Sequence, residues 1–313
     1  MNNNAYRIKQ YILLTRPYSI MDVGLIGLLG YILSITSNPQ IIDIDIIITS
    51  INISFISILY WVGFNWLNES IQKDKGRIKI PYIAPILIFI FTTLWYIIIF
   101  GFSIYIIFLL ISFILYAHKH KYPFFTRYIY FLRGFNVLLL FLLFLNSNGN
   151  HEYTLDTIII IFLLFFTQSY RSFIGDFRDI EYDKYTFMKF YSIYTSKIFL
   201  FILGVLSILF GFMLSNFIGL SVLVYISFFT IIYIYIENKN MGIESYKLHQ
   251  HSIVFTFLIK VLLILTYNNT LEFANFLIFY IIFSILIAIW KSYGKVIRPI
   301  NMNKEVEAND SFI

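Results

Sequence analysis

The sequence predicts an all-α protein that crosses a membrane with about nine to ten helices. Of its 313 residues 59% are hydrophobic and only 13% are charged, and its mean hydropathy is +0.78. Soluble domains hold about 45–50% apolar and about 25% charged residues. The apolar residues also gather in runs of membrane-spanning length, and the basic residues gather in alternate connections. A soluble globular domain is therefore excluded.

The apolar runs predict the spans directly, because a helix needs roughly 20 apolar residues to cross a bilayer. In chain order we expect ten spans: 19–36, 43–66, 83–101, 103–117, 128–146, 156–174, 198–215, 217–236, 252–267 and 272–290. The first run has no small-residue cleavage site after it, so we expect a retained span and not a signal peptide. All six prolines lie in connections or at span ends, as helix interiors require.

The lysines and arginines follow this count. The first, third, fifth, seventh and ninth connections contain none of them, whereas the even connections and both ends of the chain hold nearly all. Basic residues mark the cytoplasmic side of membrane proteins. We therefore expect a multi-pass cell-membrane protein whose termini and even loops are cytoplasmic. The net charge of +6 reflects this topology and not nucleic-acid binding, and the absence of cysteine excludes disulfides and thiolate metal sites.

An acidic segment, Gly175–Lys184, directly follows the sixth span. In a helix Asp176, Asp179 and Asp183 would share one face, since they lie at i, i+3 and i+7. Carboxylates that converge in this way suit Mg²⁺, which usually bridges to substrate phosphates. At a membrane surface this indicates a substrate with a phosphate head and an apolar body. The alternative, with about equal weight for the segment alone, is a solvated loop of mixed charge.

A second polar cluster ends the second span, on the same predicted side of the membrane. Asn65, Asn68 or Glu69, and Gln72 lie at i, i+3 or i+4, and i+7, which places them on one helix face. Four spans separate this cluster from the acidic segment. The sequence therefore predicts that the protein's chemistry lies at the cytoplasmic mouth of a helical bundle.

With these two clusters the chain resembles the UbiA family of intramembrane prenyltransferases over residues 14–267. The family has an all-helical bundle, usually of nine spans, with Asp-rich motifs after the second and sixth spans. The second motif, D-x-x-D-x-x-x-D, is matched by Asp176, Asp179 and Asp183. Further matches follow in order: Leu14-Thr15-Arg16-Pro17 before the first span, Leu115-Tyr116 with Lys119, Lys121, Pro123 and Arg127 after the fourth, and Tyr246-Lys247-Leu248 entering the ninth.

The chain also departs from the family pattern. The first family motif has the form N-D-x-x-D-x-x-x-D. Asn65 and Glu69 can stand for the Asn and for the Asp four residues on, but Lys73 stands where the last Asp is expected. In the alternative register, which starts at Asn68-Glu69, Gln72 and Gly76 stand where Asp is expected. Gly175 replaces the Lys that usually precedes the second motif, and the Gly and Thr-Leu-Pro expected after Asp183 are missing. Residues 272–291 form an additional span, and residues 292–313 form a polar cytoplasmic tail.

The resemblance implies a Mg²⁺-dependent transferase that moves an isoprenoid chain from an allylic prenyl diphosphate to a lipophilic or aromatic acceptor within the lipid bilayer. Its implied catalytic residues are Asp176, Asp179, Asp183, Asn65 and Glu69, and these with Asn68 are the implied metal ligands. The candidates for binding the diphosphate are Arg16, Lys73, Arg77, Tyr116, Lys119, Lys121, Arg171 and Arg178, of which Arg171, inside a span, is preferred. Two alternatives stay open: a terpene cyclase of the same fold, and a degenerate homologue that binds lipid without chemistry.

Three further ionisable residues lie within spans, where charge is costly and often functional. Asp22 is expected to face the cavity or to pair with Arg16, and Arg133 and Lys260 lie in the fifth and ninth spans. Structural pairing is at least as plausible as catalysis for all three. Histidines at i, i+2 spacing suit no helical metal site, so we expect His118, His120, His249 and His251 at the surface.

Overall fold

The computed structural model describes residues 17–36, 44–71, 80–148, 153–178, 187–236, 241–268 and 271–293. Within these ranges every regular element is a helix, and no strand occurs. The helices are α2 (Pro17–Thr36), α3 (Ile44–Ile71), α4 (Ile83–Phe100), α5 (Ile104–Ala117), η1 (Lys119–Lys121), α6 (Pro123–Arg127), α7 (Ile129–Leu145), α8 (Leu155–Arg178), α9 (Phe187–Phe190), α10 (Ile193–Leu214), α11 (Asn216–Tyr235), α12 (Met241–Tyr267) and α13 (Leu271–Tyr293).

Each of the ten predicted spans corresponds to one long helix, so the predicted fold class is confirmed. In the described part of the chain six helices are long and apolar enough to cross a membrane, and four shorter apolar helices accompany them. The largest difference is at α12, which begins at Met241 where the apolar run begins at 252. Hydropathy marks only the lipid-embedded part of a helix, whereas backbone hydrogen bonds continue into polar sequence.

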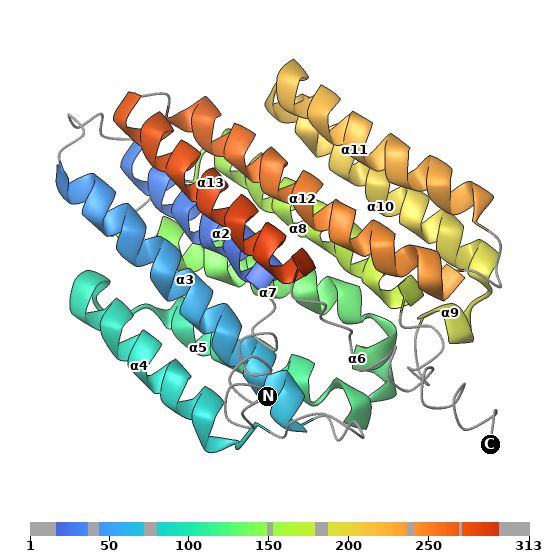
Figure 1. Ribbon diagram of the computed structural model, residues 1–313, viewed down its shortest axis with the longest axis horizontal. Helices are drawn as coiled ribbons and strands as arrows, with labels where there is room; N and C mark the ends of the chain where they lie inside the picture. The colour runs from blue at the N-terminus through green and yellow to red at the C-terminus, as the bar shows by residue number, and fades with distance from the viewer. Residues whose placement is uncertain are drawn as a thin grey trace.

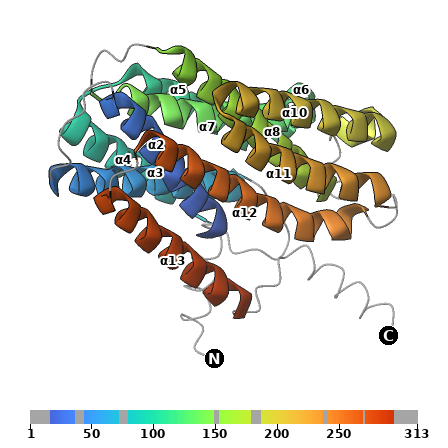
Figure 2. The same ribbon diagram turned by 90° about the horizontal axis from the view of Figure 1, so that it is seen from above.

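Two helices occupy the interior of the bundle. α2 packs against α3, α7, α12 and α13, and α8 packs against α7, α10 and α12. The pairs α4/α5 and α10/α11 lie at opposite edges, and α13 lies on the outer side of α2 (Figures 1 and 2). Side chains on α2 and α8 are therefore the best shielded from the surroundings of the bundle.

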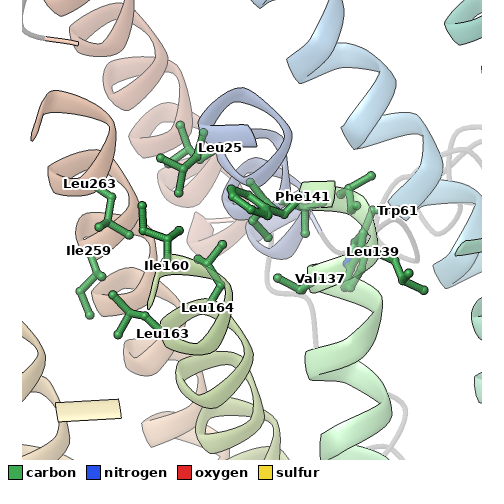
Figure 3. Close-up of a cluster of buried hydrophobic side chains, with 14 of the residues drawn as sticks. Leu25, Trp61, Val137, Leu139, Phe141, Ile160, Leu163, Leu164, Ile259 and Leu263 are labelled. Atoms are coloured by element: carbon green, nitrogen blue, oxygen red, sulfur yellow. The ribbon is translucent and has the colours of Figure 1, made fainter. Parts of the chain in front are cut away.

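The middle of the bundle is apolar. Leu25 of α2, Phe141 of α7, Leu164 of α8 and Leu263 of α12 converge there and are buried (Figure 3). A Cβ atom on Gly30 would lie 2.5 Å from the carbonyl oxygen of Phe141, so glycine is required where α2 approaches α7. Small residues permit such close helix contacts within membranes.

Large apolar side chains cover the outer surface. Ile98 of α4, Val224 of α11 and Phe279 of α13 are 82%, 61% and 70% exposed, and many similar residues lie around them. Contiguous apolar surface of this extent is incompatible with a water-facing monomer, whereas lipid tails would cover it. The protein is therefore a multi-pass membrane protein.

One end of the bundle carries the polar segments. α3 and α8 end there, α7 and α12 begin there, and the short helices α6 and α9 lie beside them (Figure 1). The guanidinium carbon of Arg127, at the end of α6, lies 3.1 Å from the centroid of the Phe190 ring on α9. We call this the polar end. The described members of both sequence-predicted clusters, Asn65, Asn68 and Glu69 on α3 and Asp176 on α8, belong to it.

Candidate functional site

The last two turns of α3 place polar side chains inside the protein. Asn65, Asn68 and Glu69 are 2%, 4% and 7% exposed. Below them Phe64 stacks on Phe113 of α5, with ring centroids 4.7 Å apart. Among the described residues the Oδ1 atom of Asn68 has no hydrogen-bond partner. Burying such an atom is costly unless a ligand, a metal or water meets it.

The end of α8 contributes the second part of the site. Asp176 is half-buried, and its carboxylate acts electrostatically on the hydroxyl of Tyr130 on α7. Gln168 and Ser172 lie on the same face of α8, two turns and one turn before Asp176. Both are buried, and Oε1 of Gln168 and Oγ of Ser172 have no hydrogen-bond partner in the part of the chain that is described. This polar face was not predicted from the sequence, although its i, i+4, i+8 spacing indicates it.

Two cations flank one tyrosine at the polar end. Tyr116 lies in the last turn of α5. The centroid of its ring lies 4.5 Å from Nζ of Lys119 and 5.2 Å from the guanidinium carbon of Arg133 on α7. Phe64 of α3 meets the same ring edge-on at 4.8 Å between centroids. The structure thus brings together two predicted diphosphate-binding residues, Tyr116 and Lys119, and adds Arg133. Positive charges gathered on one ring favour an anion such as a phosphate. The predicted candidate Lys121 is instead exposed.

Three charged residues inside the spans, Asp22, Arg171 and Lys260, form a buried cluster. Nη1 of Arg171 donates to Oδ2 of Asp22 at 2.5 Å and to Oγ1 of Thr256 at 2.8 Å, and Nζ of Lys260 bonds the other carboxylate oxygen of Asp22. The cluster joins α2, α8 and α12. Asp22 therefore pairs with Arg171 and Lys260. The role of Arg171 in binding a diphosphate stays a prediction, whereas its role in holding three helices together is direct.

One histidine lies elsewhere than predicted. His249 was expected at the surface but is 8% exposed, and its ring packs against Gly175 on α8. α12 begins before its apolar run, so the residues just ahead of that run are helical and face α8. His251 is exposed, as predicted.

Several predicted site residues lie outside the described residues: Arg16, Lys73, Arg77, Asp179, Asp183 and the side chain of Arg178. Within the described ranges no group of three or more His, Cys, Asp or Glu side chains gathers as a metal site. The donors that are described nevertheless fit Mg²⁺, because Asn65, Asn68, Glu69 and Asp176 offer hard oxygen atoms and that of Asn68 is unsatisfied. The full ligand set stays a prediction.

No family model and no curated protein matches the sequence. Solved structures do. A digeranylgeranylglyceryl phosphate synthase is 19% identical, with a TM-score of 0.55 over 83% of this chain and 99% of its own. A UbiA homologue from Archaeoglobus fulgidus, solved with bound Cd²⁺ and in a second structure, is 16% and 14% identical, with TM-scores of 0.52 over 80% of this chain and 99% of its own.

These matches span nearly the whole of each neighbour. At this level of identity the likeness concerns the arrangement of the helices. The chain has the fold of the UbiA-type intramembrane prenyltransferases.

Proposed function

We propose that the protein is a Mg²⁺-dependent prenyltransferase that moves an isoprenoid chain from an allylic prenyl diphosphate to a lipophilic or aromatic acceptor. One observation carries the proposal: two polar helix ends, those of α3 and α8, are buried at the same end of a bundle whose outer surface is apolar. An apolar body with a phosphate head suits that combination. The polar end is the cytoplasmic side in this proposal, because the basic connections lie there.

The cations beside Tyr116 would bind the diphosphate. Lys119 is 8% exposed, so its charge acts in a medium of low dielectric and attracts an anion more strongly than a surface lysine does. Arg133 offers a planar set of N–H donors that matches phosphate oxygens. Both cations lie beside the Tyr116 ring, which supports a shared role in binding the diphosphate.

The oxygen atoms of α3 and α8 would hold the metal. Asn65, Asn68 and Glu69 approach from α3, and Asp176 leads into Asp179 and Asp183 from α8. A Mg²⁺ ion held there would supply positive charge to neutralise the leaving diphosphate. Asn65 and Glu69 are buried, and a site closed to bulk water would protect the allylic cation from hydrolysis.

The acceptor would then attack the allylic cation and lose a proton, while the diphosphate leaves. The buried residues in the middle of α2, α7 and α8 are apolar. An isoprenoid chain placed there would lie among Leu and Phe side chains, as in lipid. Acceptor atoms with available electron density would meet the allylic carbon at the boundary between the two environments.

The test uses purified full-length protein in lipid nanodiscs with geranyl, farnesyl or geranylgeranyl diphosphate and Mg²⁺. We expect release of diphosphate that EDTA abolishes and that an acceptor-containing lipid extract accelerates. A hydrocarbon or terpene alcohol formed without acceptor would identify a cyclase instead. Binding without release for every donor would identify a non-catalytic lipid-binding protein.

Variants localise the activity. Asp179→Ala and Asp183→Ala should each abolish the Mg²⁺-dependent release while the protein still accumulates in membranes, because each removes one expected metal ligand. Unchanged release in both variants would show that the chemistry does not use the acidic segment.

A further inference from the structure

His249 is buried, and its ring packs closely against Gly175 of α8. A Cβ atom on Gly175 would lie 3.3 Å from Cε1 and 3.5 Å from Nδ1 of the imidazole. Glycine is a poor helix former, so its presence within α8 needs a reason from packing. The reason visible in the structure is the ring of His249, which reaches α8 from α12.

The position lies at the polar end of the bundle, beside the proposed metal site. Gly175 immediately precedes Asp176 in α8. One helical turn away lie Ser172 on α8 and Ser245 on α12, and both are buried. Neither serine hydroxyl has a hydrogen-bond partner among the residues that are described. Buried polar atoms are normally satisfied, so their presence here points to water or a polar ligand beside the imidazole.

We propose that His249 is a further donor-binding residue: a ring N–H donates a hydrogen bond to the diphosphate of the prenyl donor, next to Asp176. The proposal rests on the proposed function. Imidazole carries an N–H in either tautomer and in its protonated form, so the bond does not depend on which form is present. A hydrogen bond to a diphosphate oxygen is charge-assisted and short, and it fixes the donor's orientation.

With this assignment three helices hold the donor. α3 and α8 would supply the oxygen atoms for the metal, and α12 would supply a hydrogen-bond donor, the His249 ring that packs against Gly175. α12 is also tied to α8 by the hydrogen bond of Arg171 to Thr256. That tie lies about seven residues, or two turns, deeper along α12 than His249, so the imidazole is carried by a well-anchored segment.

The test separates donation from packing by substitution at the ring. His249→Phe keeps a ring against Gly175 but removes both nitrogen atoms, whereas His249→Gln keeps an N–H donor. For Mg²⁺-dependent diphosphate release in nanodiscs we expect His249→Phe to raise KM for farnesyl diphosphate about tenfold with kcat within about threefold. His249→Gln should recover most of the loss. His251→Phe, on the exposed side of the same helix, is the matched control and should match the parent protein.

A second measurement is independent of turnover. Calorimetric titration of Mg²⁺ and inorganic pyrophosphate into full-length protein should show about tenfold weaker binding for His249→Phe, with unchanged thermal unfolding. Gly175→Ala provides a second variant should His249→Phe not fold: its Cβ displaces the ring, so pyrophosphate binding should weaken about threefold.

The outcomes separate the two proposals. If the parent protein binds pyrophosphate and the His249→Phe and Gly175→Ala variants bind it equally well, the role of His249 is overturned and the proposed function stands. Parent protein that neither binds pyrophosphate nor releases it from any prenyl donor would overturn both.

Discussion

Two sets of polar side chains on α8 differ in whether the protein itself satisfies them. Arg171 is paired within the protein: its guanidinium donates hydrogen bonds to Asp22 and Thr256, and Lys260 bonds the carboxylate of Asp22 as well. Ser172, one residue on, and Asp176, five residues on, are further polar side chains of the same helix. The hydroxyl of Ser172 has no protein partner among the described residues, and neither has Oε1 of Gln168, three residues before Arg171.

This difference indicates which residues are structural and which are functional. We call Arg171 with Asp22, Lys260 and Thr256 the closed set, and Gln168, Ser172 and Asp176 the open set. A charged group within a membrane is tolerated when it is paired, and such a pair contributes by holding helices in register. Buried polar atoms without protein partners instead mark the place where something else binds. Arg171 and Asp176 lie only five residues apart, about 7.5 Å along the helix axis. Proximity alone therefore does not assign Arg171 to the substrate.

The largest effect is expected when the closed set loses the negative charge of Asp22. Asp22→Asn leaves Arg171 and Lys260 buried without their counter-charge, and removing one partner of a buried ion pair costs about 3–5 kcal/mol. We expect a matching fall in the free energy of unfolding in detergent micelles and poor accumulation in membranes. Lys260→Met should cost less, because Asp22 keeps its bond to Arg171.

The control for this variant is Asp156→Asn on the same helix α8 as Arg171, exposed at the other end of the bundle. It should change the unfolding free energy by less than about 0.5 kcal/mol. Parent-like stability of Asp22→Asn would mean that the three charges do not hold α2, α8 and α12 together.

A substitution in the open set should lower activity and leave the unfolding free energy unchanged. Asp176→Asn removes one negative charge from the proposed metal site. We expect diphosphate release to fall about 10²–10³-fold, the range for losing one electrostatic stabiliser of a transition state. The unfolding free energy should stay close to that of the parent. Loss of folding together with loss of activity would place Asp176 among the structural charges beside Arg171.

The sequence predicts much of this comparison. Apolar runs and alternate basic connections predict the ten long helices, and i, i+3, i+4 spacing predicts that Asn65 and Glu69 share a face of α3. Both signals are periodic within one segment. Periodicity shows which side chains of a helix point the same way, and it does so before any tertiary contact is known.

Contacts between helices were not predictable in the same way. Asp22 and Lys260 are 238 residues apart, and no spacing rule relates them. The burial of His249 was missed for a related reason: hydropathy placed it before the span, whereas α12 continues through it and faces α8. Which helix a face meets depends on packing. Only the folded bundle shows that Arg133 meets Tyr116.

A smaller effect is expected at the cations beside Tyr116. Lys119→Ala removes one of two charges near the ring, so we expect KM for the prenyl diphosphate to rise about tenfold, which corresponds to about 1.4 kcal/mol. Lys121→Ala is the matched control, since Lys121 lies two residues away and is exposed. Equal changes in both variants would indicate general attraction by a basic surface and not a bound diphosphate.

The smallest effect is expected on the unfolding free energy when Gln168 of the open set is replaced. Oε1 of Gln168 is buried without a hydrogen-bond partner in the described structure, and replacing such a group by an apolar one of similar size is nearly neutral or stabilising. Gln168→Leu should therefore raise the unfolding free energy of the ligand-free protein by about 0–1 kcal/mol while it weakens donor binding modestly. Thr167→Val, at the preceding position, is the comparison variant, because the hydroxyl of Thr167 donates to the carbonyl of Leu163 and lies on another face of α8. A clear loss of stability in Gln168→Leu would show that this side chain is satisfied within the fold. The open set would then consist of Ser172 and Asp176 alone.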